Sequence, residues 1–180
     1  MKTIMYCHGR GSTGRGSKST IIKNYFEQHK FVANDYPTND PVETNKDKPM
    51  PCDLHQMKEF WRYVQMLTGD IKIHKPDVII ASSFGGAVLT RVIMEGGWTG
   101  PTVFLAQAAH KFGVTDTLPV GCEAIYIHGT EDDVVNFEGS AVLAGTSSNA
   151  KLVTVSDGHR LKADESREAY LTAIAELLQD

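Results

Sequence analysis

Residues 78–89 read VIIASSFGGAVL, and their pattern indicates how the chain folds. It begins with a continuous, largely β-branched apolar run, the composition expected of a parallel strand buried on both faces. Small residues and then a helical pattern follow. This order predicts a strand, a sharp turn and a helix, with Ser83 at the turn.

The residues around Ser83 have the spacing of a nucleophile elbow. A serine on so sharp a turn needs small residues two positions before and after it, because strand and helix approach closely there. Ser83 has Ala81 and Gly85 at these positions. Ser82 is less suitable because Phe84 would occupy the downstream position. The spacing is that of G-x-S-x-G with alanine as the first residue, although a serine that only caps the following helix is the alternative.

Composition limits the class of protein. A chain of 180 residues with 41% hydrophobic and 22% charged residues is typical of one globular domain, here residues 1–180. The net charge of −4 argues against a nucleic-acid partner. The three cysteines include no C-x-x-C pair, so we expect reduced thiols, no zinc site and a cytoplasmic location. No segment is apolar over a membrane-spanning length, so we expect no membrane partner.

Strand-like and helix-like segments alternate along the chain. Strands are expected at 2–6, 31–34, 78–82, 102–106, 124–128 and 152–155. Helices are expected from about Ser17, from Asp53 to Gly69, after Ser83 and from about Asp164. Gly69 is expected to end the second of these helices. The pattern predicts an α/β fold, a three-layer sandwich around a mostly parallel six-stranded sheet.

Four unusual polar turns each follow a strand directly. They are residues 8–11, Ser83, Asp132 and His159. A parallel sheet would bring them together at one edge, where ligands bind in such folds. The order along the chain is serine, then aspartate, then histidine, which is that of the α/β-hydrolase triad.

These motifs resemble those of the α/β-hydrolase superfamily. They are HGRG at 8–11, SSFGG at 82–86, HGTEDDVV at 128–135 and DGH at 157–159, and they span nearly the whole chain. The glycine-rich loop and the serines and lysine after it are also similar to those of small, lidless bacterial serine esterases. The resemblance implies a minimal α/β-hydrolase fold without a cap domain.

Chemistry and resemblance together suggest a role for each residue. Ser83 would be the nucleophile, His159 its general base and Asp132 the acid that orients the histidine. Asp133 and Glu131 stay alternatives for the acid.

The resemblance further implies that backbone N–H groups of two residues form the oxyanion hole. These would be Arg10, which follows His-Gly, and Phe84, which follows the elbow serine. His8 and His128, each before a glycine at a strand end, are expected to be buried and structural.

The predicted reaction is hydrolysis of a small-molecule carboxylic ester, or a thioester, through an acyl-enzyme, without cofactor or metal. The short connections between the last three strands leave little room for a lid, which favours small or exposed acyl groups. The natural substrate and the oligomeric state stay open. Lysine and arginine residues show no clustered patch along the sequence, so we expect them on a solvated surface.

Two other functions are weighed against this one. Gly9-x-Gly11-x-x-Gly14 follows a strand, opens a helix and precedes Asp35 by about twenty residues, which is a dinucleotide-binding fingerprint. A hydrolase fold that only binds, without catalysis, is the second alternative. In the hydrolase reading, Asp35 and Tyr36 are expected to form a pocket wall.

Overall fold

The structure, a computed structural model, describes residues 1–36, 38, 58–114, 118 and 122–179. Within these ranges six parallel strands form one sheet in the order β2-β1-β3-β4-β5-β6. The strands are β1 (Thr3–Cys7), β2 (Lys30–Val32), β3 (Val78–Ser82), β4 (Thr102–Leu105), β5 (Ala124–Gly129) and β6 (Ala150–Val155). Each predicted strand is present, with ends within two residues of expectation.

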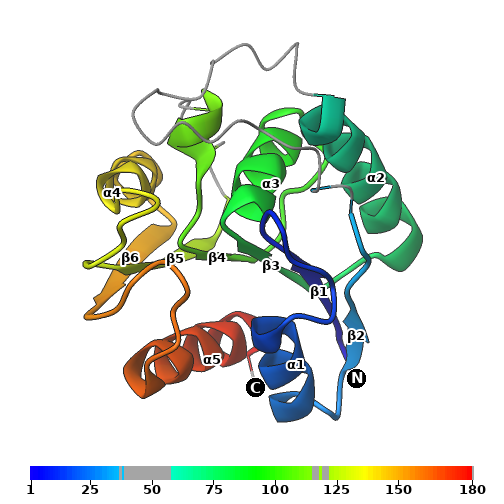
Figure 1. The fold of residues 1–180 in the computed structure, drawn as a ribbon. Helices are drawn as coiled ribbons and strands as arrows, with labels where there is room; N and C mark the ends of the chain where they lie inside the picture. Colours follow the sequence, from blue (N-terminus) through cyan, green and yellow to red (C-terminus); the bar gives the residue numbers. More distant parts are fainter. Residues whose placement is uncertain (37, 39–57, 115–117, 119–121, 180) are drawn as a thin grey trace.

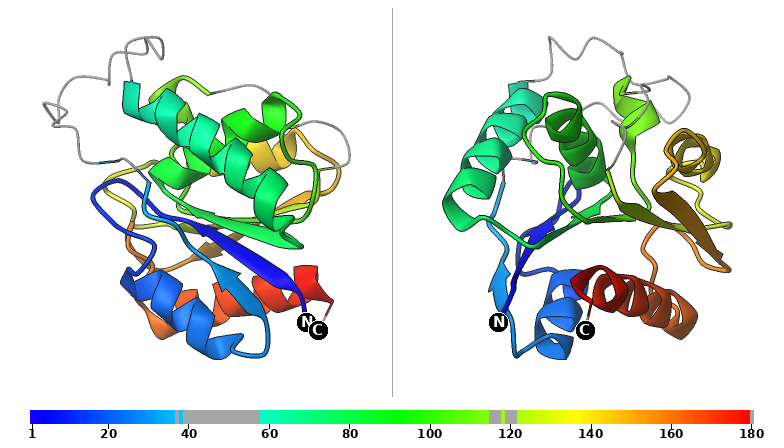
Figure 2. Two further views of the ribbon diagram at one scale, coloured as in Figure 1. Left: turned by 90° about the vertical axis from the view of Figure 1, so that its right-hand side faces the viewer. Right: turned by 180° about the vertical axis from the view of Figure 1, so that it is seen from behind.

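Helices cover both faces of the sheet (Figures 1 and 2). α2 (Lys58–His74), α3 (Phe84–Met94), the 3-10 turn η2 (Ala109–Phe112) and α4 (Glu138–Gly145) lie on one face. α1 (Ser17–Tyr25) and α5 (Asp164–Leu178) lie on the other. The predicted three-layer α/β sandwich is confirmed.

β3 lies inside the sheet, between β1 and β4. Every one of its residues is buried. Its side chains alternate between two apolar cores: Ile79 packs into the core under α2 and α3, and Ile80 packs into the core under α1 and α5. A strand with helices on both faces needs apolar residues at successive positions, which explains the continuous run in the sequence. Burial on both sides fixes the position of the turn that follows β3.

The strand order reverses between β1 and β3. From β1 the chain first forms β2 on one side, then crosses to form β3 on the other side. Cys7 at the end of β1 pairs with Ala81 in β3, so the loops after both strands begin at the same edge. Such a switch point is where open α/β sheets bind ligands.

One helix end differs from the prediction. Gly69 does not end α2, which continues to His74, and the predicted start at Asp53 lies outside the described residues. A glycine inside a helix costs only about 0.5–1 kcal/mol relative to alanine, and the extra turn buries Ile71. The helix ends where Lys75 takes a left-handed φ of 46° before Pro76, because the residue before proline disfavours helical geometry.

No helix in the described ranges combines the length and the hydropathy that crossing a membrane requires.

Candidate active site

Ser83 lies at the sharp turn between β3 and α3. Its backbone has φ 52° and ψ −116°, a region in which a non-glycine residue costs on the order of 1–3 kcal/mol. A Cβ atom on Gly85 would lie 2.6 Å from the carbonyl oxygens of Cys7 and His8, so no larger residue fits there. The strained serine and the close glycine are the geometry that the elbow motif predicted.

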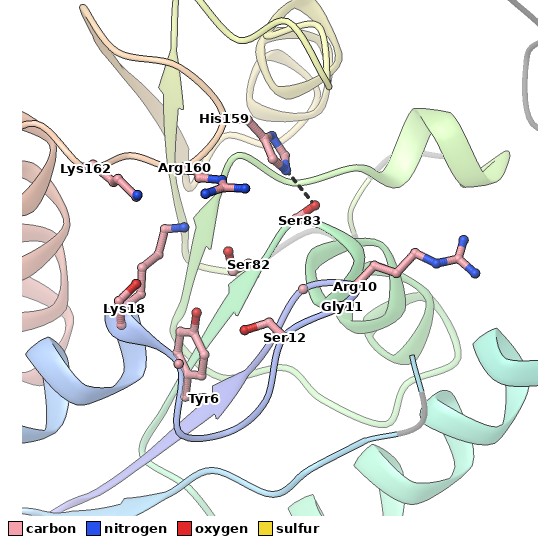
Figure 3. A pocket seen from close by; sticks show the side chains of 13 residues that line it. Tyr6, Arg10, Gly11, Ser12, Lys18, Ser82, Ser83, His159, Arg160 and Lys162 are labelled. Carbon is pink, nitrogen blue, oxygen red and sulfur yellow. Dashed lines mark hydrogen bonds between the residues drawn. The ribbon is translucent and has the colours of Figure 1, made fainter. Parts of the chain in front are cut away.

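The Ser83 hydroxyl contacts an imidazole from near the other end of the chain. Ser83 Oγ lies 2.9 Å from His159 Nε2 (Figure 3). His159 Nδ1 lies 2.8 Å from Asp132 Oδ2. If the Nδ1–H donates to the carboxylate, Nε2 is the acceptor for the serine hydroxyl. The structure therefore brings the three predicted side chains into one hydrogen-bonded chain.

Asp132, and not either acidic neighbour, contacts His159. The Asp132 side chain is 1% exposed, whereas Glu131 and Asp133 are exposed. Asp132 Oδ1 accepts hydrogen bonds from the backbone N–H groups of Val134 at 2.9 Å and Val135 at 2.8 Å. These bonds hold the carboxylate with its second oxygen toward His159.

A second histidine, His128, also contacts the Asp132 carboxylate. Its Nε2 lies 3.0 Å from Asp132 Oδ2 and 3.0 Å from the Val135 carbonyl oxygen. Since both partners are acceptors, Nε2 carries the proton. Its Nδ1 then accepts the Ser140 hydroxyl at 2.7 Å, and Ser140 Oγ accepts the Gln107 side-chain amide at 3.0 Å. The buried network fixes the tautomer of His128 and the orientation of Asp132.

These contacts keep Asp132 ionised. Burial raises the pKa of this carboxyl, but hydrogen bonds from His128, from His159 and from the two backbone N–H groups more than offset it, so the pKa lies well below its ordinary value of 3.8. A carboxylate that stays charged can orient an imidazole and stabilise its protonated form. His128 was expected to be a buried, structural histidine. The structure adds that it forms a hydrogen bond with the Asp132 carboxylate.

The glycine-rich loop after β1 packs against its own neighbours. Asp35 Oδ1 accepts the Gly14 N–H at 2.7 Å, and its Oδ2 accepts the Arg15 guanidinium at 3.0 Å. A Cβ atom on Gly14 would lie 2.3 Å from the Ala33 carbonyl oxygen. The acidic residue of the dinucleotide fingerprint is thus bound to the loop, and close packing accounts for the third glycine.

The prediction that Tyr36 forms a pocket wall is wrong. Tyr36 is buried, and its hydroxyl donates to Asp70 Oδ2 at 2.7 Å. Its N–H donates to His8 Nε2 at 2.8 Å, while His8 Nδ1 lies 2.9 Å from the Gly9 carbonyl oxygen. Burial lowers the pKa of His8, which keeps this imidazole neutral. Neither residue is among those that line the pocket beside Ser83 and His159.

The two predicted oxyanion-hole residues border Ser83. Phe84 opens α3, and the N–H groups of a first helical turn have no partner within the helix. Arg10 lines the pocket beside Ser83 with its guanidinium directed away from it, 2.5 Å from a Glu59 carboxylate oxygen (Figure 3).

A pocket of about 400 Å³ opens beside Ser83 and His159. The other residues with side chains that line it are Tyr6, Arg10, Ser12, Ser17, Lys18, Ser82, Arg160 and Lys162. Arg160 and Lys162 are exposed, as expected of a solvated surface. The expectation that basic residues form no cluster is wrong, because both line this pocket together with Lys18. Arg160 and Lys162 follow His159 closely, but nothing in the sequence links them to Lys18, which is more than 140 positions away.

Thiol and metal chemistry have little support among the described side chains. Cys7 and Cys122 are buried, free thiols, and burial raises the pKa of both, which makes a thiol unreactive. Cys52 lies outside the described residues. In the parts of the chain that the structure describes, no group of three or more His, Cys, Asp or Glu side chains could hold a metal ion.

No protein-family model and no curated protein matches the sequence. Solved structures do match. Alpha/beta hydrolase domain-containing protein 10 from mouse is 14% identical with a TM-score of 0.74, over 98% of this chain and 89% of that one. The esterase EaEST from Exiguobacterium antarcticum is 12% identical with a TM-score of 0.70, over 100% and 92%.

A third similar structure is Est1E from Butyrivibrio proteoclasticus with bound ferulic acid. It is 14% identical with a TM-score of 0.70, over 99% of this chain and 88% of that chain. The chain therefore has the α/β-hydrolase fold. Sequence identities this low show the fold alone, so the reaction has to be argued from the site.

Proposed function

We propose that the protein is a serine hydrolase that cleaves carboxylic esters, with thioesters as the alternative substrate class. The observation that carries the proposal is the continuous hydrogen-bonded chain from Ser83 through His159 to Asp132. A serine hydroxyl becomes nucleophilic when a base takes its proton, and the base needs a carboxylate to hold its tautomer. All three groups are within hydrogen-bond distance, and the serine faces a pocket.

The first half of the reaction makes an acyl-enzyme. Ser83 Oγ bonds to the carbonyl carbon of the ester while its proton moves to His159 Nε2. The carbonyl oxygen becomes an oxyanion, which the N–H groups of Arg10 and Phe84 stabilise. When the intermediate collapses, the bond to the alcohol oxygen breaks and His159 returns the proton to the leaving alcohol.

The second half repeats these steps with water. His159 takes a proton from a water molecule, whose oxygen bonds to the acyl carbon. Collapse of the second oxyanion breaks the bond to Ser83 Oγ, which regains its proton from His159. Asp132 stays ionised throughout and stabilises the imidazolium each time it forms.

Labelling with a fluorophosphonate tests the proposal, because this probe reacts with an activated serine. We expect labelling at Ser83, mapped by fragment mass spectrometry to separate it from Ser82, and turnover of p-nitrophenyl acetate. Ser83→Ala should abolish both, whereas Ser148→Ala, at an exposed serine, should keep both. Turnover that persists in Ser83→Ala removes this residue from the mechanism, and an unlabelled wild-type protein favours the silent binding fold.

A further inference from the structure

The pocket beside Ser83 has an excess of positive charge. Lys18, Arg160 and Lys162 line it, and no acidic side chain among the described residues does. The three cations lie together on one side of Ser83, away from the Arg10 guanidinium (Figure 3). This concentration is unexpected in a chain whose net charge is −4.

Protein carboxylates in the described residues lie too far from these cations to form ion pairs with them. Within the described residues none of the three forms an ion pair. Asp157 lines a neighbouring hollow together with Arg160 and Lys162, but its carboxylate accepts hydrogen bonds from the N–H groups of Gly158 and Ala163, at 2.7 Å each, and from the Ser166 hydroxyl at 2.6 Å. The negative charge of Asp157 weakens the positive potential in the pocket. Both of its carboxylate oxygens, however, already accept hydrogen bonds from other protein groups.

Lys18 is the innermost of the three cations. It is the second residue of α1 and is mostly buried, whereas Arg160 and Lys162 are exposed. Burial lowers the pKa of Lys18 to about 8, with Asp157 and Asp132 opposing this effect and the two neighbouring cations adding to it. A mostly buried amine without a counter-ion gains most from a bound anion, because the anion restores the interactions lost with water.

Uncharged donors surround the same space. The hydroxyl groups of Ser12 and Ser17 line the pocket, and the first turn of α1 contains no acidic residue. The positive end of that helix therefore faces the pocket without an internal counter-charge. Hydroxyl donors, a helix start and three cations are the groups that bind a carboxylate or a phosphate.

We propose, on the basis of the proposed esterase function, that the substrate is an anionic ester whose carboxylate or phosphate binds Lys18, Arg160 and Lys162 while Ser83 attacks its ester carbonyl. The pocket volume suits a small ligand. The anion contributes binding energy at a distance from the reacting bond and orients the ester toward Ser83.

Pairs of esters that differ by one anionic group test this assignment. Monomethyl and dimethyl succinate differ on the acyl side, 3-acetoxypropanoate and propyl acetate differ on the alcohol side, and acetylated glycerol 3-phosphate and glycerol monoacetate differ by a phosphate. We expect the anionic member of at least one pair to have a kcat/KM higher by about ten- to a hundredfold. The preference should decrease with added salt.

Two lysines of one helix form the matched variants. Lys18→Met and Lys23→Met each remove one positive charge from α1, but Lys23 is exposed in the last turn. We expect Lys18→Met to reduce the anionic-to-neutral ratio of kcat/KM by about tenfold. Lys23→Met should leave both rates unchanged.

A binding experiment separates this proposal from the proposed function. In Ser83→Ala, which should not turn over, calorimetry should detect monomethyl succinate but not dimethyl succinate, and adding Lys18→Met should weaken the binding. Ser83-dependent hydrolysis with equal kcat/KM in all three pairs overturns the anionic substrate class and keeps the esterase. Absence of all ester hydrolysis overturns the esterase, and the calorimetry then decides whether the pocket binds anions.

Discussion

Replacing Lys18 by methionine should make the protein more stable. Lys18 is mostly buried, and its pKa is lowered to about 8 from an ordinary value of 10.5, first by burial and then by Arg160 and Lys162 against the opposing effect of Asp157. The folded protein therefore disfavours the charged form of this amine relative to the unfolded chain. Methionine has a similar length and no charge, so it keeps most of the packing of the lysine stem.

The magnitude follows from the two pKa values. The folded-state pKa lies below the unfolded one, so the penalty is complete where the amine is charged in both states, below about pH 8, and vanishes above about pH 10.5. At 1.36 kcal/mol per pKa unit, Lys18 costs about 3 kcal/mol at pH 7 and about 1 kcal/mol at pH 10. Lys18→Met should gain this free energy of unfolding relative to wild type.

Urea denaturation at pH 7 and pH 10 measures the effect. Lys23→Met is the control, because it removes the same charge from an exposed position of α1 and should change the stability by no more than about 0.5 kcal/mol. If Lys18→Met is no more stable than Lys23→Met at pH 7, the burial argument is wrong. If its advantage is the same at both pH values, packing and not charge is the cause.

Three further predictions concern the site and its supports. Asp132→Asn should lower kcat for p-nitrophenyl acetate by about 10³–10⁴-fold, whereas Asp133→Asn should change it little, and equal losses would contradict the assignment of the acid. His128→Phe should lower kcat and also destabilise the fold by about 1–3 kcal/mol, because the Asp132 and Ser140 partners lose a buried hydrogen bond; an unchanged kcat would confine this histidine to stability. Gly85→Ala should prevent folding or severely destabilise the fold, since the new Cβ would lie 2.6 Å from backbone oxygens. In urea denaturation, Gly69→Ala should stabilise the protein by about 0.5–1 kcal/mol, because the space around Gly69 is open and alanine favours the helix.

Much of the fold was predictable because its signals are local. The buried strand, the small residues of the elbow and the helix after Ser83 all lie within residues 78–89. The positions of Asp132 and His159 directly after strands were also readable, because parallel strands bring such turns to one edge. These predictions required only the types of residues adjacent in the sequence and the rule that parallel strands end at the same edge of a sheet.

Local reasoning was insufficient where two signals competed. Glycine is a common helix terminator, but α2 continues past Gly69 and ends at His74, before Lys75 with its left-handed φ. The burial of Ile71 in the core outweighs the small cost of the glycine. Only the packed structure shows which effect is larger.

The α/β class, the sharp serine turn and the candidate triad were predictable before folding, because each depends on residue type and on position relative to a strand. The tertiary structure alone decided that His128 contacts the Asp132 carboxylate and that Lys18 joins Arg160 and Lys162 at one pocket. The physical reason is that electrostatic and hydrogen-bond interactions depend on separation in space. Residues far apart in the chain meet only after the sheet and its helices have packed.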